Sequence, residues 1–207
     1  HHSNKIINFD NFLIKKRYKA DGIITSVPKF SLGILTADCV PILVADKENK
    51  IIAAIHSGWK GANSGIIENL IKKFKEKKSK ISNLIVAIGP CIAKKNYEVQ
   101  KDFVNKIKLK NKNFKKYFTN NNKKIYFNLR LFVNDKFLRF RKNPLFSVNP
   151  LRNKFHKREL PICARLELMN KSCFSNASAK LQLGVLSSAS EIFKSSPNSS
   201  VIKGKFS

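Results

Sequence analysis

The chain has 207 residues, a formal net charge of +28, and 43% hydrophobic residues. This length and apolar content suit one globular domain with a substantial core, and no run of about eighteen apolar residues is present that could cross a membrane. The positive charge would suit a polyanionic partner, but no nucleic-acid-binding motif accompanies the lysines, so we expect a solvated lysine surface rather than a nucleic-acid interface.

Short apolar runs alternate with helical patterns up to about residue 140. The continuous apolar run 51–55 predicts a strand that is buried on both faces, and the polar segment 46–50 before it predicts a hairpin loop. Further strands are predicted over 20–25, 32–36, 41–45 and 84–88. Helical spacing of apolar residues predicts a helix that begins after Gly65, with Asn63 or Ser64 as its N-cap. Two more helices are predicted over 97–109 and 127–140.

Strands that alternate with helices, some joined by hairpins, predict a single α/β domain, an α/β sandwich with a mixed β-sheet. We place this domain at residues 1–140. Residues 141–207 hold twelve serines and no Asp, and this composition predicts a divergent or partly disordered C-terminal segment. The chain does not begin with Met, so we expect an N-terminal part of the domain to be missing.

The four cysteines indicate a reducing compartment. They fall at irregular spacings without a CxxC pair, which argues against a disulfide framework and against a four-cysteine zinc site. We therefore expect a cytoplasmic protein in which each cysteine is either a small buried hydrophobe or a site residue.

Three groups of reactive residues lie at the ends of predicted strands, at 36–39, 56–61 and 89–92. The Cys39 thiolate and the His56 imidazole are good ligands for zinc. Asp38 could orient a ligand or act as a general base, and Lys60 offers a positive charge to an anionic group. A metal site that acts in an enzyme is therefore one interpretation of these residues.

A structural interpretation of the same residues stays open. A single His after a strand is often a satisfied structural residue, and a buried Cys often serves only as a small hydrophobe. Trp59 suits a core or a pocket wall. His1 and His2 could be the remnant of a purification tag.

Four motifs, in order and at compatible spacing, resemble a known family. They are ADGIIT at 20–25, TADCVPIL at 36–43, AIHSGWKG at 54–61 and IGPCI at 88–92. The chain is similar over about residues 1–140 to the multicopper polyphenol oxidoreductase (laccase-domain) family. Members of that family are regarded as purine nucleoside phosphorylases with adenosine deaminase side activity.

The resemblance implies a zinc site with three protein ligands. His2, in a segment HSNKI that matches the family's first metal-binding segment, is the first ligand, Cys39 the second and His56 the third. Three protein ligands leave a fourth position open for a reactant. The resemblance therefore argues against the interpretation of His2 as part of a tag.

The implied substrates are purine nucleosides, such as adenosine and inosine, together with phosphate. Phosphate would attack C1′ of the ribose, and zinc would activate a water for attack on C6 of adenine. Asp38 is the candidate for a proton-handling or orienting role and Lys60 for holding phosphate. Cys91 is expected at the pocket, without an assigned role.

Two other functions remain as alternatives. A copper-dependent polyphenol oxidase could hold Cu²⁺ with one Cys and two His, although a laccase proper needs more His ligands than the four histidines of this chain. An inactive lysine-rich nucleic-acid-binding protein is the second alternative. The family's closing motifs, FSYRR-like and Gly-Arg, are not found after Phe140.

Overall fold

The computed structural model describes residues 2–10, 19–140, 147–150, 162–165 and 182–185. Its strands are β1 (Ile6–Asn8), β2 (Gly22–Thr25), β3 (Val40–Asp46), β4 (Ile51–Ser57), β5 (Leu84–Ile88), β6 (Glu98–Val99), β7 (Phe118–Asn121), β8 (Lys124–Phe127), β9 (Ser147–Pro150), β10 (Ile162–Arg165) and β11 (Gln182–Val185). The α-helices are α1 (Trp59–Ser64), α2 (Ile66–Glu76), α3 (Lys101–Lys108) and α4 (Leu129–Leu138). Single 3₁₀ turns occur at Ile81–Asn83, Lys94–Asn96 and Phe114–Tyr117.

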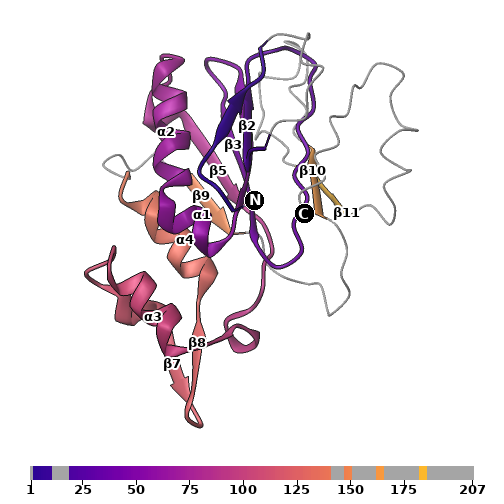
Figure 1. The fold of residues 1–207 in the computed structure, drawn as a ribbon. Coiled ribbons are helices and arrows are strands. Elements are labelled where there is room, and N and C mark those ends of the chain that lie inside the picture. The colour runs from indigo at the N-terminus through magenta and orange to yellow at the C-terminus, as the bar shows by residue number, and fades with distance from the viewer. Residues whose placement is uncertain (1, 11–18, 141–146, 151–161, 166–181, 186–207) are drawn as a thin grey trace.

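The main sheet is mixed, as predicted. Its strand order is β1-β2-β4-β3-β5-β9. The central pairs β2–β4, β4–β3 and β3–β5 are antiparallel, whereas the outer pairs β1–β2 and β5–β9 are parallel. Helices α1, α2 and α4 lie along one face of this sheet (Figure 1). The expectation of a mixed-sheet α/β domain is therefore confirmed.

The central strands are buried throughout, because apolar residues occupy both of their faces. All seven residues of β3 and all seven of β4 are buried, which confirms the prediction for 51–55. The polar segment between them forms the predicted hairpin loop and brings Lys50 into the left-handed region, with a φ of 55°.

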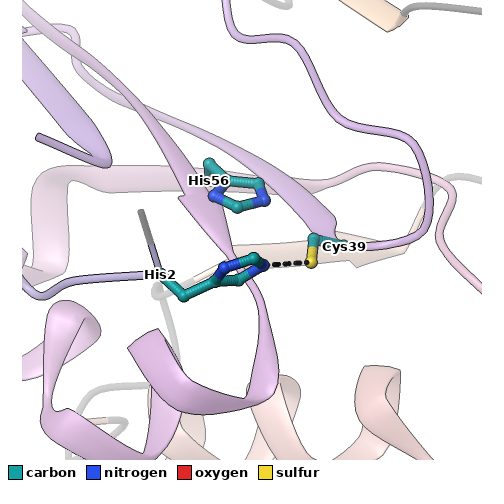
Figure 2. A group of neighbouring side chains, drawn as sticks. All are labelled: His2, Cys39 and His56. Atoms are coloured by element: carbon teal, nitrogen blue, oxygen red, sulfur yellow. Dashed lines mark hydrogen bonds between the residues drawn. The ribbon is translucent and has the colours of Figure 1, made fainter. Parts of the chain in front are cut away.

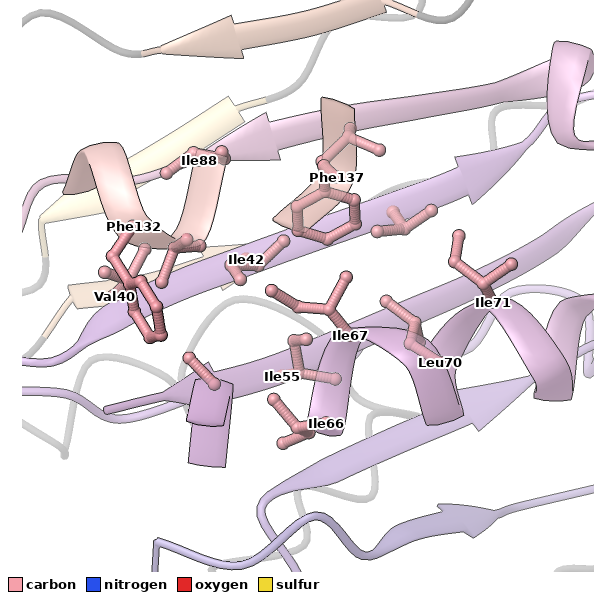
Figure 3. Packing of buried hydrophobic residues seen from close by; sticks show 14 of the residues in the cluster. Val40, Ile42, Ile55, Ile66, Ile67, Leu70, Ile71, Ile88, Phe132 and Phe137 are labelled. Carbon is pink, nitrogen blue, oxygen red and sulfur yellow. The ribbon is translucent and has the colours of Figure 1, made fainter. Parts of the chain in front are cut away.

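The larger core lies between the sheet and its helices. Figure 3 shows Ile66, Ile67, Leu70 and Ile71 of α2 packed against Ile42 and Ile55 of the central strands. Figure 3 also places Phe132, near the beginning of α4, beside Val40 at the start of β3, with Phe137 farther along the sheet. The N-terminal end of α4 therefore points toward the end of the sheet at which β3 begins.

A second apolar cluster covers the opposite face and corrects one prediction. The segment 32–36 is not a strand. Buried and exposed residues nevertheless alternate in this segment. Leu32 and Ile34 are buried against Leu43 and Ala54 of the sheet, whereas Leu35 faces outward. The segment crosses the sheet face and does not join its edge, so its backbone makes no strand ladder.

The structure also corrects several helix boundaries. The N-cap of α2 is Gly65, with a φ of 93°, while Asn63 and Ser64 belong to α1, a helix that the sequence did not reveal. The predicted helix 97–109 begins only at Lys101, because 98–99 pair with β8 as strand β6. The predicted helix 127–140 is confirmed as α4, shorter by two residues at each end.

The predicted C-terminal segment, 141–207, falls for the most part outside the described residues. Within the part of the chain that the structure describes, none of the helices is long and apolar enough to span a bilayer.

Candidate metal centre

Three potential metal ligands from distant parts of the chain converge at one end of the sheet. His2 lies ahead of β1, Cys39 immediately precedes β3, and His56 is the sixth residue of β4. Their ligand atoms all lie within 4.8 Å of one another. Figure 2 shows the two imidazoles and the thiol directed toward a common point. The structure therefore brings together the three residues that the sequence analysis singled out as ligands.

Strand pairing explains how Cys39 and His56 meet. In the β3–β4 pair, Pro41 lies opposite His56 and Val40 opposite Ser57. Because Cys39 directly precedes this ladder, its side chain lies at the same sheet end as the last residues of β4. The β3–β4 hairpin therefore brings the two donors together although they lie far apart in the sequence.

Asp21 fixes the positions of both histidines. Its side chain is fully buried and accepts hydrogen bonds from the backbone N–H of His2 at 3.2 Å and from the Ser3 hydroxyl at 2.6 Å. The Ser3 N–H donates to it as well, and His56 Nδ1 lies 3.0 Å from the Asp21 carboxylate. Burial raises the pKa of Asp21, but the hydrogen bonds from Ser3 and His56 outweigh it and bring the pKa to about 2.

An ionised Asp21 dictates the tautomer of His56. A carboxylate can only accept a hydrogen bond, so Nδ1 of His56 is the protonated nitrogen in this contact, and Nε2 is the ring nitrogen left for a metal. This is the arrangement in which a carboxylate holds a histidine that ligates a metal through its other ring nitrogen.

The backbone of His2 is held in a conformation that non-glycine residues seldom adopt. Its φ of 54° lies in the left-handed region, and the contact of its N–H with Asp21 stabilises it there. Strained backbone of this kind costs about 1–3 kcal/mol and is concentrated at functional sites. The His2 imidazole lies beside Cys39, whose Sγ is 3.5 Å from His2 Nε2.

Gly58 supplies the space in which these side chains meet. A Cβ at this position would lie 2.6 Å from Cδ2 of His2 and 2.8 Å from Sγ of Cys39. Its φ of −75° is open to any residue, so the requirement for glycine is steric.

The chemistry of the three donors and the separation of one donor pair are compatible with a zinc ion. A thiolate at about 2.3 Å and an imidazole at about 2.0 Å from tetrahedral zinc would lie about 3.5 Å apart, as Cys39 and His2 do. Burial and the neighbouring His56 lower the pKa of His2, which favours the neutral, ligating form. Burial and the charge of Asp38 raise the pKa of the Cys39 thiol to about 11, so a cation is what would favour its thiolate.

The other predicted site residues surround this centre. Asp38 is exposed, and its carbonyl accepts a hydrogen bond from the Ile92 N–H at 2.9 Å. Lys60 is exposed in the first turn of α1, where its charge lowers the pKa of His2 and its Nζ lies 5.8 Å from the Trp59 ring centroid. Cys91 is half-buried in the loop after β5.

Three further residues belong to this region and were not predicted as site residues. Asp21 lay in a quoted motif but received no role. Burial raises the pKa of the Cys91 thiol, and Arg130 opposes part of this rise. Tyr97 is half-buried, and burial together with the nearby Cys39 and Asp38 raises its pKa to about 12. Only the ADGIIT motif gave a sequence signal for any of the three, at Asp21.

Residues 1–141 match the family described as multi-copper polyphenol oxidoreductase laccase. The chain belongs to this family. It is 41% identical over 134 residues to a purine nucleoside phosphorylase of Rickettsia conorii, and 40% identical over 134 residues to one of Rickettsia prowazekii. Each alignment covers 64% of this chain and 55% of the relative, so the chain spans about half the length of these relatives.

Solved structures share the fold at lower identity. The chain superposes on the hypothetical protein YfiH of Bacillus licheniformis with a TM-score of 0.64 and 23% identity, over 73% of this chain and 60% of that protein. YlmD of Geobacillus stearothermophilus gives a TM-score of 0.63 and 19% identity, over 72% of this chain and 59% of YlmD. These similarities support the architecture described above.

Proposed function

We propose that this chain is a zinc-dependent purine nucleoside phosphorylase that acts on inosine and adenosine. The observation that carries the proposal is the convergence of His2, Cys39 and His56 within 4.8 Å at one end of the sheet. The names of the relatives supply the reaction class, and the steric demand at Gly58 and the support from Asp21 suit a built centre more than a chance contact.

His2, Cys39 and His56 would hold the ion. When bound, zinc would supply a Lewis acid beside the reacting nucleoside. Among the described residues, one cluster of three donors could hold a metal, which suits a single-ion centre better than the several copper centres of a laccase. We therefore retain zinc over Cu²⁺.

In phosphorolysis one bond to C1′ replaces another, and the departing purine takes up one proton. A phosphate oxygen forms a bond to C1′ of the ribose as the bond from C1′ to N9 breaks. The electron pair of that bond goes to the purine, which takes up a proton and leaves as the free base, with ribose 1-phosphate as the other product. We assign the transfer of this proton to Asp38, which is exposed and adjacent to Cys39, and the attraction of phosphate to Lys60, whose charge acts on His2.

Adenosine deamination is the second activity that we propose for the same centre. Water would replace the amino group at C6, with inosine and ammonia as products. A three-ligand zinc centre with an open coordination position suits this hydrolysis as well as phosphorolysis. Asp38 would again be the proton-transferring group.

A paired assay tests the proposal. Purified protein is incubated with inosine or adenosine, with and without phosphate, and free purine, inosine and ribose 1-phosphate are quantified along with bound metal. We expect phosphate-dependent release of hypoxanthine from inosine by zinc-containing protein. Cys39→Ala should lose both metal and activity, whereas Thr119→Ala, an exposed change on β7, should keep both. Full nucleoside cleavage by metal-free Cys39→Ala would contradict the proposal.

A further inference from the structure

The segment that carries His2 is attached to the main sheet on one side. The Asp21 carboxylate, just ahead of β2, accepts hydrogen bonds from the N–H groups of His2 and Ser3. The N–H of Asp21 in turn donates to the carbonyl of Lys5 at 3.1 Å. Asp21 therefore spans residues 2–5 and ties them to the sheet.

The other side of the same segment is attached to the corner between α1 and α2, through Asn4. The side-chain N–H of Asn4 donates to the carbonyl of Ser64, the last residue of α1, at 3.0 Å. The carbonyls at the end of a helix need donors of this kind. The side-chain N–H of Asn69, the fourth residue of α2, donates to the carbonyl of Asn4 at 2.7 Å. Asn4 is thus held both through its side chain and through its backbone.

The backbone between His2 and Asn4 also lies directly on α1. A Cβ at Gly61, which is buried in α1, would lie 3.1 Å from the carbonyl oxygen of Ser3. This is closer than an ordinary van der Waals contact. Contact with α1 therefore limits movement of the segment toward the helices, and the hydrogen bond from Asn69 limits movement away from them.

The position of His2 depends on these attachments more than the positions of the other two proposed ligands do. Cys39 directly precedes β3 and His56 lies within β4, so the central strands place both of them. His2 is exposed and lies outside any strand, two residues before Asn4. If its segment were loose, binding of an ion would have to order it, and the lost conformational freedom would weaken that binding.

We propose that Asn69 is a positioning residue of the metal centre, which acts through the carbonyl of Asn4 to hold His2 where it can share an ion with Cys39 and His56. The inference rests on the proposed function and adds to it a residue of α2 outside the donor set. Asp21 sets the position of the segment from the side of the sheet, and Asn69 sets it from the side of the helices.

A double-mutant cycle between Asn69 and His2 separates this role from a general contribution to the stability of the fold. Zinc affinity is measured by chelator competition for the wild type, Asn69→Ala, His2→Ala and the double variant. Asn69→Gln keeps the amide donor on a longer side chain. Asn105→Ala, the same change at an exposed position of α3, is the matched control. Urea unfolding of each metal-free protein reports whether the variant is folded.

Asn69→Ala should weaken zinc affinity about 3- to 10-fold, the range expected for loss of one ordinary hydrogen bond. In the His2→Ala background the same change should alter zinc affinity less than about twofold, because no imidazole is left to position. Asn69→Gln should recover part of the lost affinity, and Asn105→Ala should match the wild type.

Unchanged zinc affinity in folded Asn69→Ala would overturn the inference and leave the proposed function intact. An equal loss of affinity with and without the His2 imidazole would overturn it too, because the hydrogen bond would then act only on the fold. Should Asn69→Ala fail to fold, Asn69→Ser carries the same cycle. A wild type that binds no zinc would instead refute the proposed metal centre, and that result is visible before any variant is compared.

Discussion

Gly58 faces two of the proposed metal ligands across a distance that leaves no room for a methyl group. Gly58→Ala should therefore displace His2 or Cys39 and lower zinc affinity by about 10- to 100-fold, the range found when groups that orient metal ligands are lost. Because its φ of −75° suits alanine, the free energy of unfolding of the metal-free protein should change little. Chelator competition measures the affinity, and urea unfolding measures the stability.

Gly33→Ala is the control for this substitution, because a Cβ at position 33 would have no neighbouring atom within 4 Å. Equal zinc affinities of Gly58→Ala and Gly33→Ala would show that the proposed ligands do not need the space at position 58.

The sequence predicted the proposed ligands unequally. Cys39 and His56 could be predicted from the residues themselves, because Cys39 directly precedes one buried apolar run and His56 directly follows another. His2 required the family resemblance, because nothing in its local sequence indicates a position beside residues 39 and 56. Asp21 was missed as a site residue, because its burial and its contacts with both histidines arise only when the strands assemble.

At the scale of whole elements, α2 is held to the sheet by its apolar face. Phe74, near its end, is 1% exposed within the larger core. Phe74→Ala should lower the free energy of unfolding by about 3–5 kcal/mol, since it removes buried surface and leaves a cavity. Leu109→Ala is the control, because Leu109 is 85% exposed and its loss should cost less than about 0.5 kcal/mol. Similar losses for both variants in urea unfolding would contradict this assignment of the core.

An ion pair joins the segment after β1 to the end of α2. Lys77, the C-cap residue of α2, contacts Asp10. Burial raises the pKa of Asp10, but the contacts with Lys77 and Ser26 outweigh it and bring the pKa to about 2, below the ordinary value of 3.8. The carboxylate therefore stabilises the fold above pH 3.8, and this contribution is lost as the pH falls toward 2.

Asp10→Asn should consequently cost about 1 kcal/mol at pH 7, the upper range for partly exposed ion pairs. The difference in free energy of unfolding between wild type and Asp10→Asn should shrink between pH 4 and pH 3, because Asp10 takes up a proton there in the unfolded chain, where its pKa is 3.8, but not in the folded protein, where its pKa is about 2. Urea unfolding at pH 7, 4 and 3 measures it. If this difference in free energy of unfolding increased as the pH fell, the Asp10–Lys77 ion pair would not be the source of the stabilisation.

Strands were more accessible to prediction than helix boundaries. β5 was predicted residue for residue, because a short apolar run between polar residues and Gly-Pro has one consistent interpretation. Helix α1 was missed, since two glycines near its start suggested a loop, and packing against β4 and α4 stabilises it instead. The segment 32–36 has the alternation of a strand, and only the three-dimensional arrangement shows that it covers a sheet face without pairing.

For the molecule as a whole, the net charge of +28 predicts a non-specific attraction to polyanions. Retention on heparin and on DNA of unrelated sequences should be similar and should fall steeply with salt, because released counterions drive such binding. Elution of the protein in a salt gradient measures this. Salt-resistant, sequence-selective binding without nucleoside cleavage would favour the nucleic-acid-binding alternative over an enzyme.

The distribution of the three donors has a mechanical consequence. β1 is a three-residue strand at the margin of the main sheet, and His2 lies ahead of it. An ion bound by His2, Cys39 and His56 would cross-link the segment before β1 to the central strands, and it would close one loop between His2 and Cys39 and another between Cys39 and His56. Stripping the ion should then free the beginning of the chain first, so that the margin of the sheet loosens before its centre does.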